Sequence, residues 1–332
     1  MNAFGNLFRV QIFGESHGPV VGVCIDGCPA GIPLRADDFT TDIERRKPGA
    51  KGTTPRKEED VPIFQSGVFN DHTTGAPLTI VFTNNNTRSI DYDKHRNQPR
   101  PGHADFVSNK KYGGFEDYRG GGHFSGRLTV CLVAAGVVAK KTIQYLYSDS
   151  PIEIHANISE VAGETEIDKG IQKAIDANDT VGGIVTCTTT GLPIGLGEPF
   201  FNSLESLISH AVFSIPAIKG IEFGAGFEAA SMFGSEHNDA LLLPDGTTQT
   251  NFSGGIVGGL SNGNPMVFRV AVKPPSSTPQ IQETLNLASG QIEKLSVEGR
   301  HDLCIALRVP VVIESVTAMV LADALMHPSL SR

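Results

Sequence analysis

Four short stretches of the chain show the alternating, β-branched apolar pattern that is typical of β-strands. They are VVGVCIDG at 20–27, PLTIVFT at 77–83, GIVTCTTTG at 183–191 and MVFRVAVK at 266–273. The pattern predicts a strand at each of these four places.

Four longer segments show the periodicity of helices. The clearest runs from Ser125 to Tyr147, where a serine that can cap a helix precedes a long Ala, Val and Leu surface. That surface is wide enough for the helix to be buried on most of its sides. The other three helices are predicted at 166–178, 203–215 and 311–326. Helices and strands alternate without a regular period, so neither a solenoid nor a propeller is indicated.

The domain organisation follows from the connections between these elements. No linker divides the chain convincingly, so we expect a single domain of mixed α and β structure over residues 1–332. An internal two-fold arrangement stays open. Long polar loops are expected at 44–60, 84–124 and 254–265, and loops of this length in a compact domain are usually functional or disordered.

Composition narrows the class of protein. The chain is 39% hydrophobic and 19% charged, as in an ordinary soluble protein, and it lacks a signal peptide and a long uncharged apolar stretch. We therefore expect a cytoplasmic protein that does not bind membranes, and the net charge of −9 argues against binding to nucleic acid. The five cysteines are scattered and match no zinc spacing, which favours reduced thiols and no metal site.

Positive charge is concentrated locally in this acidic chain. RRKPGAKGTTPRK, from Arg45 to Lys57, holds six basic residues and no acid, and 88–127 holds eight basic residues against five acids. Guanidinium groups suit phosphate and carboxylate oxygens, so arginines on separate loops are predicted to converge on a small polyanion. A solvated basic surface is the alternative.

Three histidines lie near these basic stretches: His17 in GESHG, His103 in RPGHAD and His123 in RGGGHFSGR. A histidine beside arginines and a bound phosphate can act as a general acid, because its protonated form is then stabilised. A solvated loop histidine is the alternative for each. Asp302, between Arg300 and an apolar run, could orient a neighbour or accept a proton, or simply form a surface ion pair.

Two glycine-rich stretches resemble phosphate loops only superficially. RGGGHFSGR and SGGIVGGLSNGNP fit neither the Walker pattern nor the Rossmann fingerprint, which disfavours a phosphotransferase. The first leads directly into the helix predicted from Ser125, so an anion site at that helix N-terminus is expected. KPPSST at 273–278 offers a lysine and three hydroxyls as a further anion contact, or forms an ordinary turn.

Several blocks of sequence, in order, resemble the chorismate synthase family. FGESHGPVVGVCIDGCPAGIP is similar to its N-terminal signature, and RRKPG with TTPRKEED to its basic loop. SGVFNDHTTGAPLTIVFTNNNTRSIDY with RPGHAD resembles the central block. YRGGGHFSGRLTVCLVAAGVVAKK and GRHDLCIALRVPVVIESVTAMVLAD resemble the second and third signatures. The blocks cover about residues 4–326, which is far more specific than any single glycine motif.

The resemblance implies a fold and a reaction. The fold is an α+β, β-α-β sandwich with long central helices between antiparallel sheets, and the assembly is a homotetramer. The reaction is an anti 1,4-elimination of phosphate from 5-enolpyruvylshikimate 3-phosphate, giving chorismate and requiring reduced FMN. No dinucleotide fingerprint is present, so we expect an external flavin reductant rather than use of NADPH by this chain. A non-catalytic flavin- or polyanion-binding protein on the same scaffold is the alternative.

The resemblance also implies roles for individual residues. His17 would assist phosphate departure, His103 would protonate the reduced flavin, and Asp302 would act with the flavin in the final deprotonation. Anions of the substrate or flavin would be held by Arg46, Lys51, Arg100, Arg127 and Arg300. The flavin would contact His123, Phe124, Ser125, Pro216, Ala217, Gly258, Lys273, Pro274, Pro275, Ser276, Ser277 and Arg300.

The chain departs from the family pattern at three positions. Many members have Arg where this chain has His123, Glu where it has Leu128, and Asn where it has Pro216. Histidine keeps a hydrogen-bond donor but makes its charge depend on pH, and proline removes a backbone N–H. The loop between Pro48 and Arg56 is also about a residue shorter than in some members, which affects the alignment of Lys51.

Overall fold

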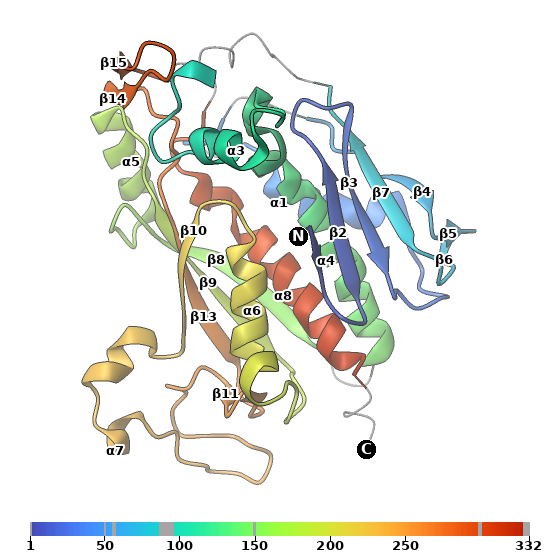
Figure 1. Ribbon diagram of the computed structural model, residues 1–332. Coiled ribbons are helices and arrows are strands. Elements are labelled where there is room, and N and C mark those ends of the chain that lie inside the picture. Colours follow the sequence, from blue (N-terminus) through green and yellow to red (C-terminus); the bar gives the residue numbers. More distant parts are fainter. Residues whose placement is uncertain are drawn as a thin grey trace.

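Two antiparallel sheets lie on either side of a layer of helices (Figure 1). The computed structural model describes residues 2–49, 51–54, 58–85, 96–148, 151–297 and 301–327. The mixed α+β class and the β-α-β sandwich expected from the sequence are confirmed.

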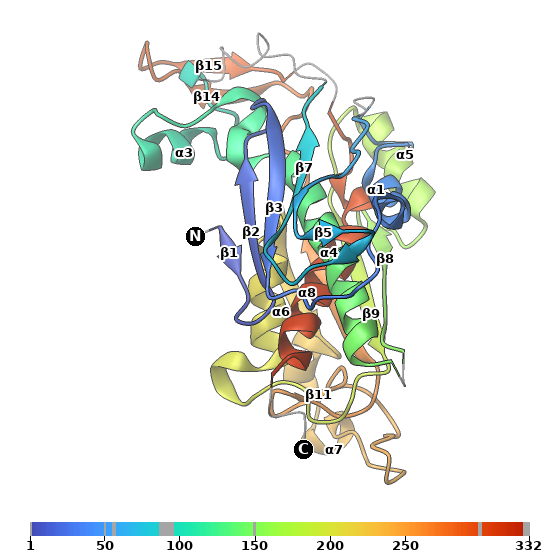
Figure 2. The same ribbon diagram turned by 90° about the vertical axis from the view of Figure 1, so that its right-hand side faces the viewer.

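The first sheet contains five strands in the order β1-β2-β3-β7-β4, all paired antiparallel. They are β1 (Ala3–Phe4), β2 (Arg9–Gly14), β3 (Val20–Asp26), β7 (Leu78–Thr83) and β4 (Ile63–Ser66). Gly14 pairs with Val21, so the connection 15–19 that carries His17 forms the turn between β2 and β3. Figure 2 shows this sheet lying over the central helices.

The second sheet contains four strands in the order β10-β13-β9-β8, also antiparallel. They are β10 (Ile218–Phe223), β13 (Met266–Val272), β9 (Gly183–Thr190) and β8 (Glu153–Val161). The inward-facing residues of β13 alternate with outward-facing ones, Met266, Phe268, Val270 and Val272 being buried. This period-2 pattern is the one that its sequence shows.

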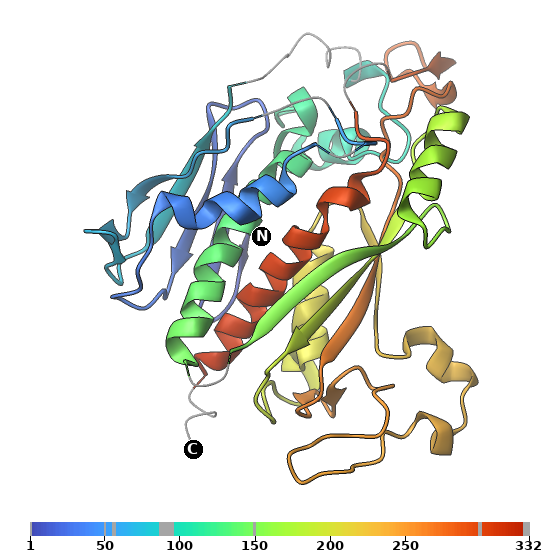
Figure 3. The same ribbon diagram turned by 180° about the vertical axis from the view of Figure 1, so that it is seen from behind.

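Helices α4 (Thr129–Leu146) and α8 (Pro310–Leu325) form the centre of the sandwich, side by side in Figure 3. Helix α4 packs on the first sheet, and α8 packs on β8 and β9 of the second. The other helices that the structure describes in full are α1 (Thr40–Arg46), α3 (Asp105–Tyr112), α5 (Ile167–Ala177), α6 (Leu204–Phe213) and α7 (Gly234–His237). Helix α6 also packs against α8.

Smaller elements complete the described chain. Three two-stranded ribbons pair β5 (Val68–Phe69) with β6 (His72–Thr73), β11 (Ile256–Val257) with β12 (Leu260–Ser261), and β14 (Gln282–Leu285) with β15 (Ile292–Leu295). Short 3₁₀ segments η4 (Gly126–Leu128) and η7 (Ile305–Arg308) lead directly into α4 and α8.

The structure confirms the four predicted strands and the four predicted helices, with small shifts at their ends. Ser125 caps the 3₁₀ turn before α4 rather than α4 itself, because its Oγ accepts a hydrogen bond from the Arg127 N–H at 3.3 Å. The prediction that 84–124 is a loop was wrong for α3, which begins at Asp105 and ends before Gly113 in the left-handed conformation. Residues 86–95 of that loop lie outside the described residues.

The two central helices touch at a glycine. A Cβ on Gly136 of α4 would lie 2.3 Å from the Cβ and 2.5 Å from the Cα of Ser315 on α8. Real Cβ atoms do not approach so closely, so only glycine permits this spacing. Both helices are buried on nearly all sides, as expected for helices that are apolar all round.

Two buried carboxylates tie α8 to its surroundings. Glu314 accepts hydrogen bonds from both Nη atoms of Arg45 at 2.7 Å, from Lys140 at 3.3 Å and from a backbone N–H of β8 at 2.9 Å. Burial raises the pKa of Glu314, but these donors lower it by more, so the pKa lies below its ordinary value of 4.5. Asp323 accepts hydrogen bonds from the backbone N–H groups of residues 6–8, which fixes the turn before β2.

Within the described ranges, one helical stretch, Arg119–Leu146, has the length and apolar composition of a membrane span. In the fold, 72% of its most apolar window is buried between the two sheets and α8. Core helices of soluble proteins have this character, so the stretch is weak support for a membrane location.

We expect Gly136→Ala to lower the free energy of unfolding by about 1–3 kcal/mol, because the added methyl group must push α4 and α8 apart. Gly234→Ala is the control, since a Cβ on Gly234 at the start of α7 meets nothing within 4 Å. Urea unfolding of both variants would measure the difference. Equal stability of the two variants would contradict the proposed close contact.

Candidate active site

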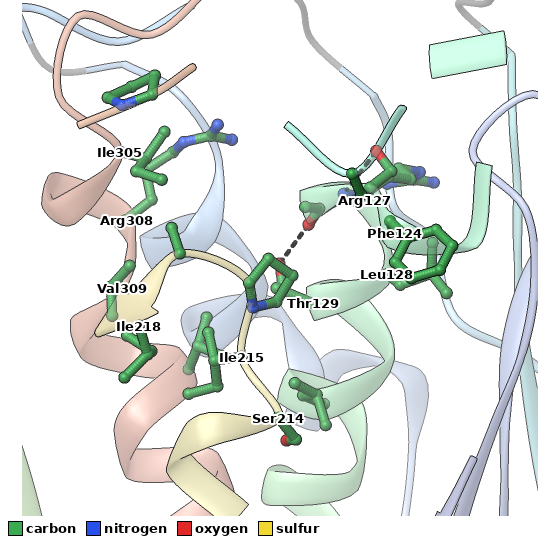
Figure 4. A pocket seen from close by; sticks show the side chains of 18 of the residues that line it. Phe124, Arg127, Leu128, Thr129, Ser214, Ile215, Ile218, Ile305, Arg308 and Val309 are labelled. Carbon is green, nitrogen blue, oxygen red and sulfur yellow. Dashed lines mark hydrogen bonds between the residues drawn. The ribbon is translucent and has the colours of Figure 1, made fainter. Parts of the chain in front are cut away.

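One cavity of about 870 Å³ opens at the end of the helical layer where α4 and α8 begin. Its wall combines an apolar floor with cationic side chains. Figure 4 shows Ile215, Ile218 and Val309 on the floor, with Arg127 and Arg308 on different sides of it. Such a cavity fits a ligand that has a flat apolar part and several anionic groups.

The N-terminal ends of both central helices face this cavity. Thr129, the first residue of α4, and Val309, next to the first residue of α8, are among the lining residues. The aligned peptide dipoles of a helix give its N-terminal end a partial positive charge. Both helices therefore add positive potential to that of the arginines in the cavity.

A buried aspartate holds two of the arginines. Asp60 accepts a hydrogen bond from Arg46 Nη2 at 2.5 Å and another from Arg127 Nη1, and its side chain is fully buried. Burial raises the pKa of Asp60, but the charges of both arginines lower it by more, so the pKa lies below its ordinary value of 3.8. Arg127 Nε also donates to Asn84 Oδ1 at 2.9 Å. The two guanidinium groups are thus fixed before any ligand binds.

A second aspartate holds Arg100 and His103. Asp105 accepts from Arg100 Nε and Nη2, both at 2.8 Å, and its Oδ1 lies 2.6 Å from His103 Nδ1. Arg100 Nη1 donates in turn to Ser277 Oγ at 3.0 Å. Burial raises the pKa of Asp105, but hydrogen bonds from Arg100 and His103 lower it by more, so it lies well below its ordinary value.

The glycine triplet 120–122 lies against both histidines of the site. A Cβ on Gly120 would lie 2.1 Å from the ring of His17, and one on Gly121 would lie 3.4 Å from the ring of His103. Gly120 has φ +60°, a backbone conformation that residues other than glycine rarely adopt. Only glycine at position 120 therefore leaves room for the His17 ring, because any side chain there would push the ring away.

Asp302 lines the cavity and forms an ion pair with Arg308. Its Oδ1 also accepts a hydrogen bond from the backbone N–H of Thr54 at 2.9 Å. These contacts hold the carboxylate in a defined orientation and link the basic loop to the segment before α8.

The segment 273–277 and the turn before β10 form another wall. Lys273 Nζ donates to Ser276 Oγ at 2.7 Å and to the carbonyl of Gly102 at 3.1 Å. Burial and the charge of Lys219 lower the pKa of Lys273. Ala217 has φ +73°, a strained conformation for a residue with a Cβ, and strain of this kind is common in functional sites.

Most predicted site residues line this one cavity. They are Arg46, Arg100, His103, His123, Phe124, Ser125, Arg127, Pro216, Ala217, Lys273, Pro274, Pro275, Ser276, Ser277 and Asp302. The structure therefore brings together segments that are up to 256 residues apart in sequence, from Arg46 to Asp302.

Three predicted residues, His17, Lys51 and Gly258, are not part of this lining. His17 is buried behind Gly120, and Lys51 donates to Gln172 Oε1 at 2.9 Å. Gly258 lies in the turn between β11 and β12, near the N-terminal end of α6, whereas the cavity lies at the C-terminal end of α6. Arg300 lies outside the described residues.

The three departures from the family pattern have defined surroundings. His123 Nδ1 lies 2.8 Å from the carbonyl of Gly14, and its Nε2 lies 3.1 Å from Asn2 Oδ1. Leu128 and Pro216 contribute apolar surface to the cavity. His123 therefore forms hydrogen bonds within the chain, whereas Leu128 and Pro216 form part of the apolar wall of the cavity.

Sequence reasoning missed Asp60, Asp105, Arg308 and Lys219, which also line or support the cavity. Asp60 and Asp105 stand inside the quoted blocks TTPRKEED and RPGHAD, so an acid close to the basic residues was the available signal. Arg308 follows Asp302 by six residues, about the length of the 3₁₀ turn η7 with its flanks. Lys219 carried no such signal.

The described residues contain no side-chain cluster of the kind that binds a metal ion. No group of three or more His, Cys, Asp or Glu residues there could hold a metal ion. The five cysteines are all described and free, and burial raises the pKa of Cys28, Cys131, Cys187 and Cys304. These thiols are therefore poor nucleophiles and poor metal ligands.

Comparison with known proteins identifies one family. The family model described as Chorismate synthase matches residues 8–326. A chorismate synthase from Chitinophaga pinensis is 69% identical over 323 residues, covering 97% of this chain and 96% of that protein. A chorismate synthase from Methanocaldococcus jannaschii is 40% identical over 362 residues, covering 97% of this chain and 96% of that protein.

A solved structure titled "Crystal Structure of Chorismate Synthase" has the same fold. It superposes with a TM-score of 0.72 and covers 97% of this chain and 92% of that chain, at 24% sequence identity. At this identity the likeness bears on the fold alone.

We expect Asp60→Asn to lower the free energy of unfolding at pH 7 by about 3 kcal/mol, because it leaves two buried guanidinium groups without a counterion. The pKa of Asp60 is depressed in the folded state, so its contribution is complete above pH 3.8 and is lost as the pH falls through the lower folded value. Denaturant unfolding at several pH values measures this.

Asp26→Asn is the control, because the pair of Arg9 and Asp26 is exposed and should contribute less than about 1 kcal/mol. A deficit of Asp60→Asn that grows as the pH falls from 7 to 4 would contradict the assignment.

Proposed function

The chain belongs to the chorismate synthase family of lyases, and we propose that it performs the family's reaction in the cavity at the ends of α4 and α8. The reaction is the anti 1,4-elimination of phosphate from 5-enolpyruvylshikimate 3-phosphate to form chorismate.

The convergence of arginines in the cavity is the observation that carries this proposal. Arg46, Arg100, Arg127 and Arg308 line the same space, together with Asp302. The substrate carries a phosphate and two carboxylates, and guanidinium forks bind such groups through paired hydrogen bonds. A neutral substrate would not require this density of charge.

Other residues of the same cavity fit reduced FMN as the cofactor. The apolar floor suits a flat ring system, and Lys273, Ser276 and Ser277 offer donors for a phosphate. A volume of about 870 Å³ lies in the upper part of the range for small-molecule sites. When bound, reduced flavin supplies an electron transiently and assists removal of the ring hydrogen.

The chain's own residues would orient the substrate and move protons. Arg46 and Arg127, held by Asp60, would bind anionic oxygens of the substrate, which lowers the cost of phosphate departure. His17, behind Gly120, would supply a proton to the leaving phosphate. His103 would hold a proton at the flavin side of the cavity, and Asp302 would accept one late in the reaction.

An assembly of four chains is part of the proposal. Phe200, Phe201, Phe227 and Phe233 are 77–93% exposed, and contact with further copies would cover them. If Gly258 contacts flavin, it does so in the cavity of another copy. Sedimentation of a stable monomer at micromolar concentration would contradict the tetramer.

We further propose that the chain folds as one domain, because residues of both sheets and of the central helices share one buried core. We also propose that it works in the cytoplasm. Recovery of the activity in a membrane fraction would contradict the location. Independent folding of a fragment would contradict the single domain.

The deciding experiment is an anaerobic assay with reduced FMN and 5-enolpyruvylshikimate 3-phosphate, following phosphate and chorismate. We expect equal amounts of both products. Folded protein that binds FMN without turnover would overturn the proposal. With NADPH as the only reductant in air we expect little turnover, since the reductant is proposed to be external, and robust activity there would contradict that part.

We expect His17→Ala and His103→Ala each to lower turnover by about two orders of magnitude, the usual effect of a positioned acid or base. His155→Ala is the matched control, because its side chain is 78% exposed on β8. Steady-state rates at substrate saturation measure the effect. Near-normal rates in both site variants would remove the proposed roles.

Gly120→Ala tests the position of His17 without changing its chemistry. The added Cβ would meet the His17 ring at 2.1 Å, so we expect a loss similar to that of His17→Ala. Gly290→Ala has the same kind of positive φ but no atom within 4 Å of the added Cβ, so it controls for backbone strain. Full activity of Gly120→Ala would show that His17 need not stay where it is.

A further inference from the structure

We propose that Asp105, to which neither the family pattern described above nor the comparisons assign a role, is a positioning residue that fixes the tautomer and orientation of His103 and joins His103 to Arg100. This inference rests on the proposed function only for its catalytic consequence. The tautomer itself is a property of the chain without substrate or flavin.

The geometry makes one carboxylate serve two partners. Oδ1 of Asp105 lies 2.6 Å from His103 Nδ1 and accepts from Arg100 Nη2 at 2.8 Å. Oδ2 accepts from Arg100 Nε at 2.8 Å and from the Arg100 backbone N–H at 3.1 Å. The side chain of Asp105 is 10% exposed, so water competes little with these contacts.

A local turn brings the three side chains together. The N–H of His103 donates to the carbonyl of Arg100 at 3.2 Å, with Gly102 at φ +68° in the turn. Asp105 follows as the first residue of α3. The motif RPGHAD therefore supplies all three side chains within six residues of sequence.

The charge of Asp105 decides which ring nitrogen carries hydrogen. With its pKa held well below the ordinary value, Asp105 is an ionised carboxylate at neutral pH and only accepts hydrogen bonds. The distance from His103 Nδ1 to Asp105 Oδ1 is 2.6 Å. If Nδ1 carried no hydrogen, its lone pair would point at a lone pair of the carboxylate oxygen, and the two would repel each other. Neutral His103 must therefore carry its hydrogen on Nδ1, which leaves the lone pair on Nε2, 3.2 Å from the donor Arg100 Nη2.

Arg100 keeps the ring in place on a different side. Its Nη2 lies 3.1 Å from Nδ1 and 3.2 Å from Nε2 of His103, nearly equidistant from both. Arg100 is itself anchored to Ser277 through Nη1 at 3.0 Å. Loss of Asp105 would therefore release the ring and loosen the link between the 100–105 segment and the 273–277 wall.

A fixed tautomer matters because only a nitrogen with a lone pair can take up a proton, and only a ring of fixed orientation can deliver one to a defined place. Carboxylates that orient metal-bound histidines change activity by about 10- to 100-fold when they are removed. We expect an effect of the same order for Asp105. If Asp105 served only to neutralise Arg100, the tautomer of His103 would not depend on it.

The test is ¹⁵N NMR of histidine-labelled protein without ligands, at a pH where His103 is neutral, with His103→Gln used to assign its signals. We expect the Nδ1–H tautomer in the wild-type chain. Asp105→Asn should shift His103 toward the Nε2–H tautomer and lower kcat by about 10- to 100-fold. Asp105→Glu, which keeps the carboxylate, should restore part of both.

Glu314→Gln is the matched control, because it breaks another two-pronged carboxylate pair, with Arg45, away from the cavity. It should lower stability while leaving the His103 tautomer and kcat unchanged. A wild-type His103 in the Nε2–H tautomer would overturn the proposal even if Asp105→Asn failed to fold. An unchanged tautomer in folded Asp105→Asn would also overturn it. Neither result depends on whether the elimination assay succeeds.

Discussion

The close approach of α4 to α8 at Gly136 and Ser315 sets the geometry on which the rest of the structure depends. Because the helices lie so near each other, one can pack on the first sheet while the other packs on the second, and a single helical layer serves both. The same approach brings their N-terminal ends to one place. Loop 120–128, which precedes α4, and segment 301–309, which precedes α8, can then form walls of one cavity.

Carboxylates organise the positive charge of that cavity. Asp60 holds Arg46 and Arg127, Asp105 holds Arg100, and Asp302 holds Arg308. Four guanidinium groups in one small space would otherwise repel each other and point toward water. A guanidinium carries five N–H donors, so each arginine keeps donors for a ligand after it has satisfied its aspartate. Each aspartate therefore orients its arginines but lowers the net positive charge of the cavity. The N-terminal ends of α4 and α8 add some positive potential.

Sequence pattern predicted the repeating elements well and the geometry of the site only in part. Strands such as 266–272 alternate clearly because one face is buried, and α4 is apolar because two layers cover it. Helix α3 escaped notice because its sequence DFVSNKKY has almost no apolar face. Asp60 was missed because its two partners are 14 and 67 residues away, a relation that no local pattern contains. The burial of His17 behind Gly120 likewise depends on how the turn 15–19 meets the loop before α4.

The three departures from the family pattern become intelligible once their neighbours are considered together. His123 binds the carbonyl of Gly14 and the side chain of Asn2, so it secures the end of β2 rather than offering a free charge to the cavity. Leu128 and Pro216 add apolar wall where a polar side chain would offer hydrogen bonds. Lys219 and Lys273 also line the cavity, and partial burial together with the charge of Lys219 lowers the pKa of Lys273. Two ammonium groups that repel each other gain most when an anion lies near both, because its charge removes the repulsion and replaces lost hydration. The cavity thus has apolar side chains at Leu128 and Pro216, where polar ones would form directed hydrogen bonds. The ammonium groups of Lys219 and Lys273 would instead attract an anion by their charge.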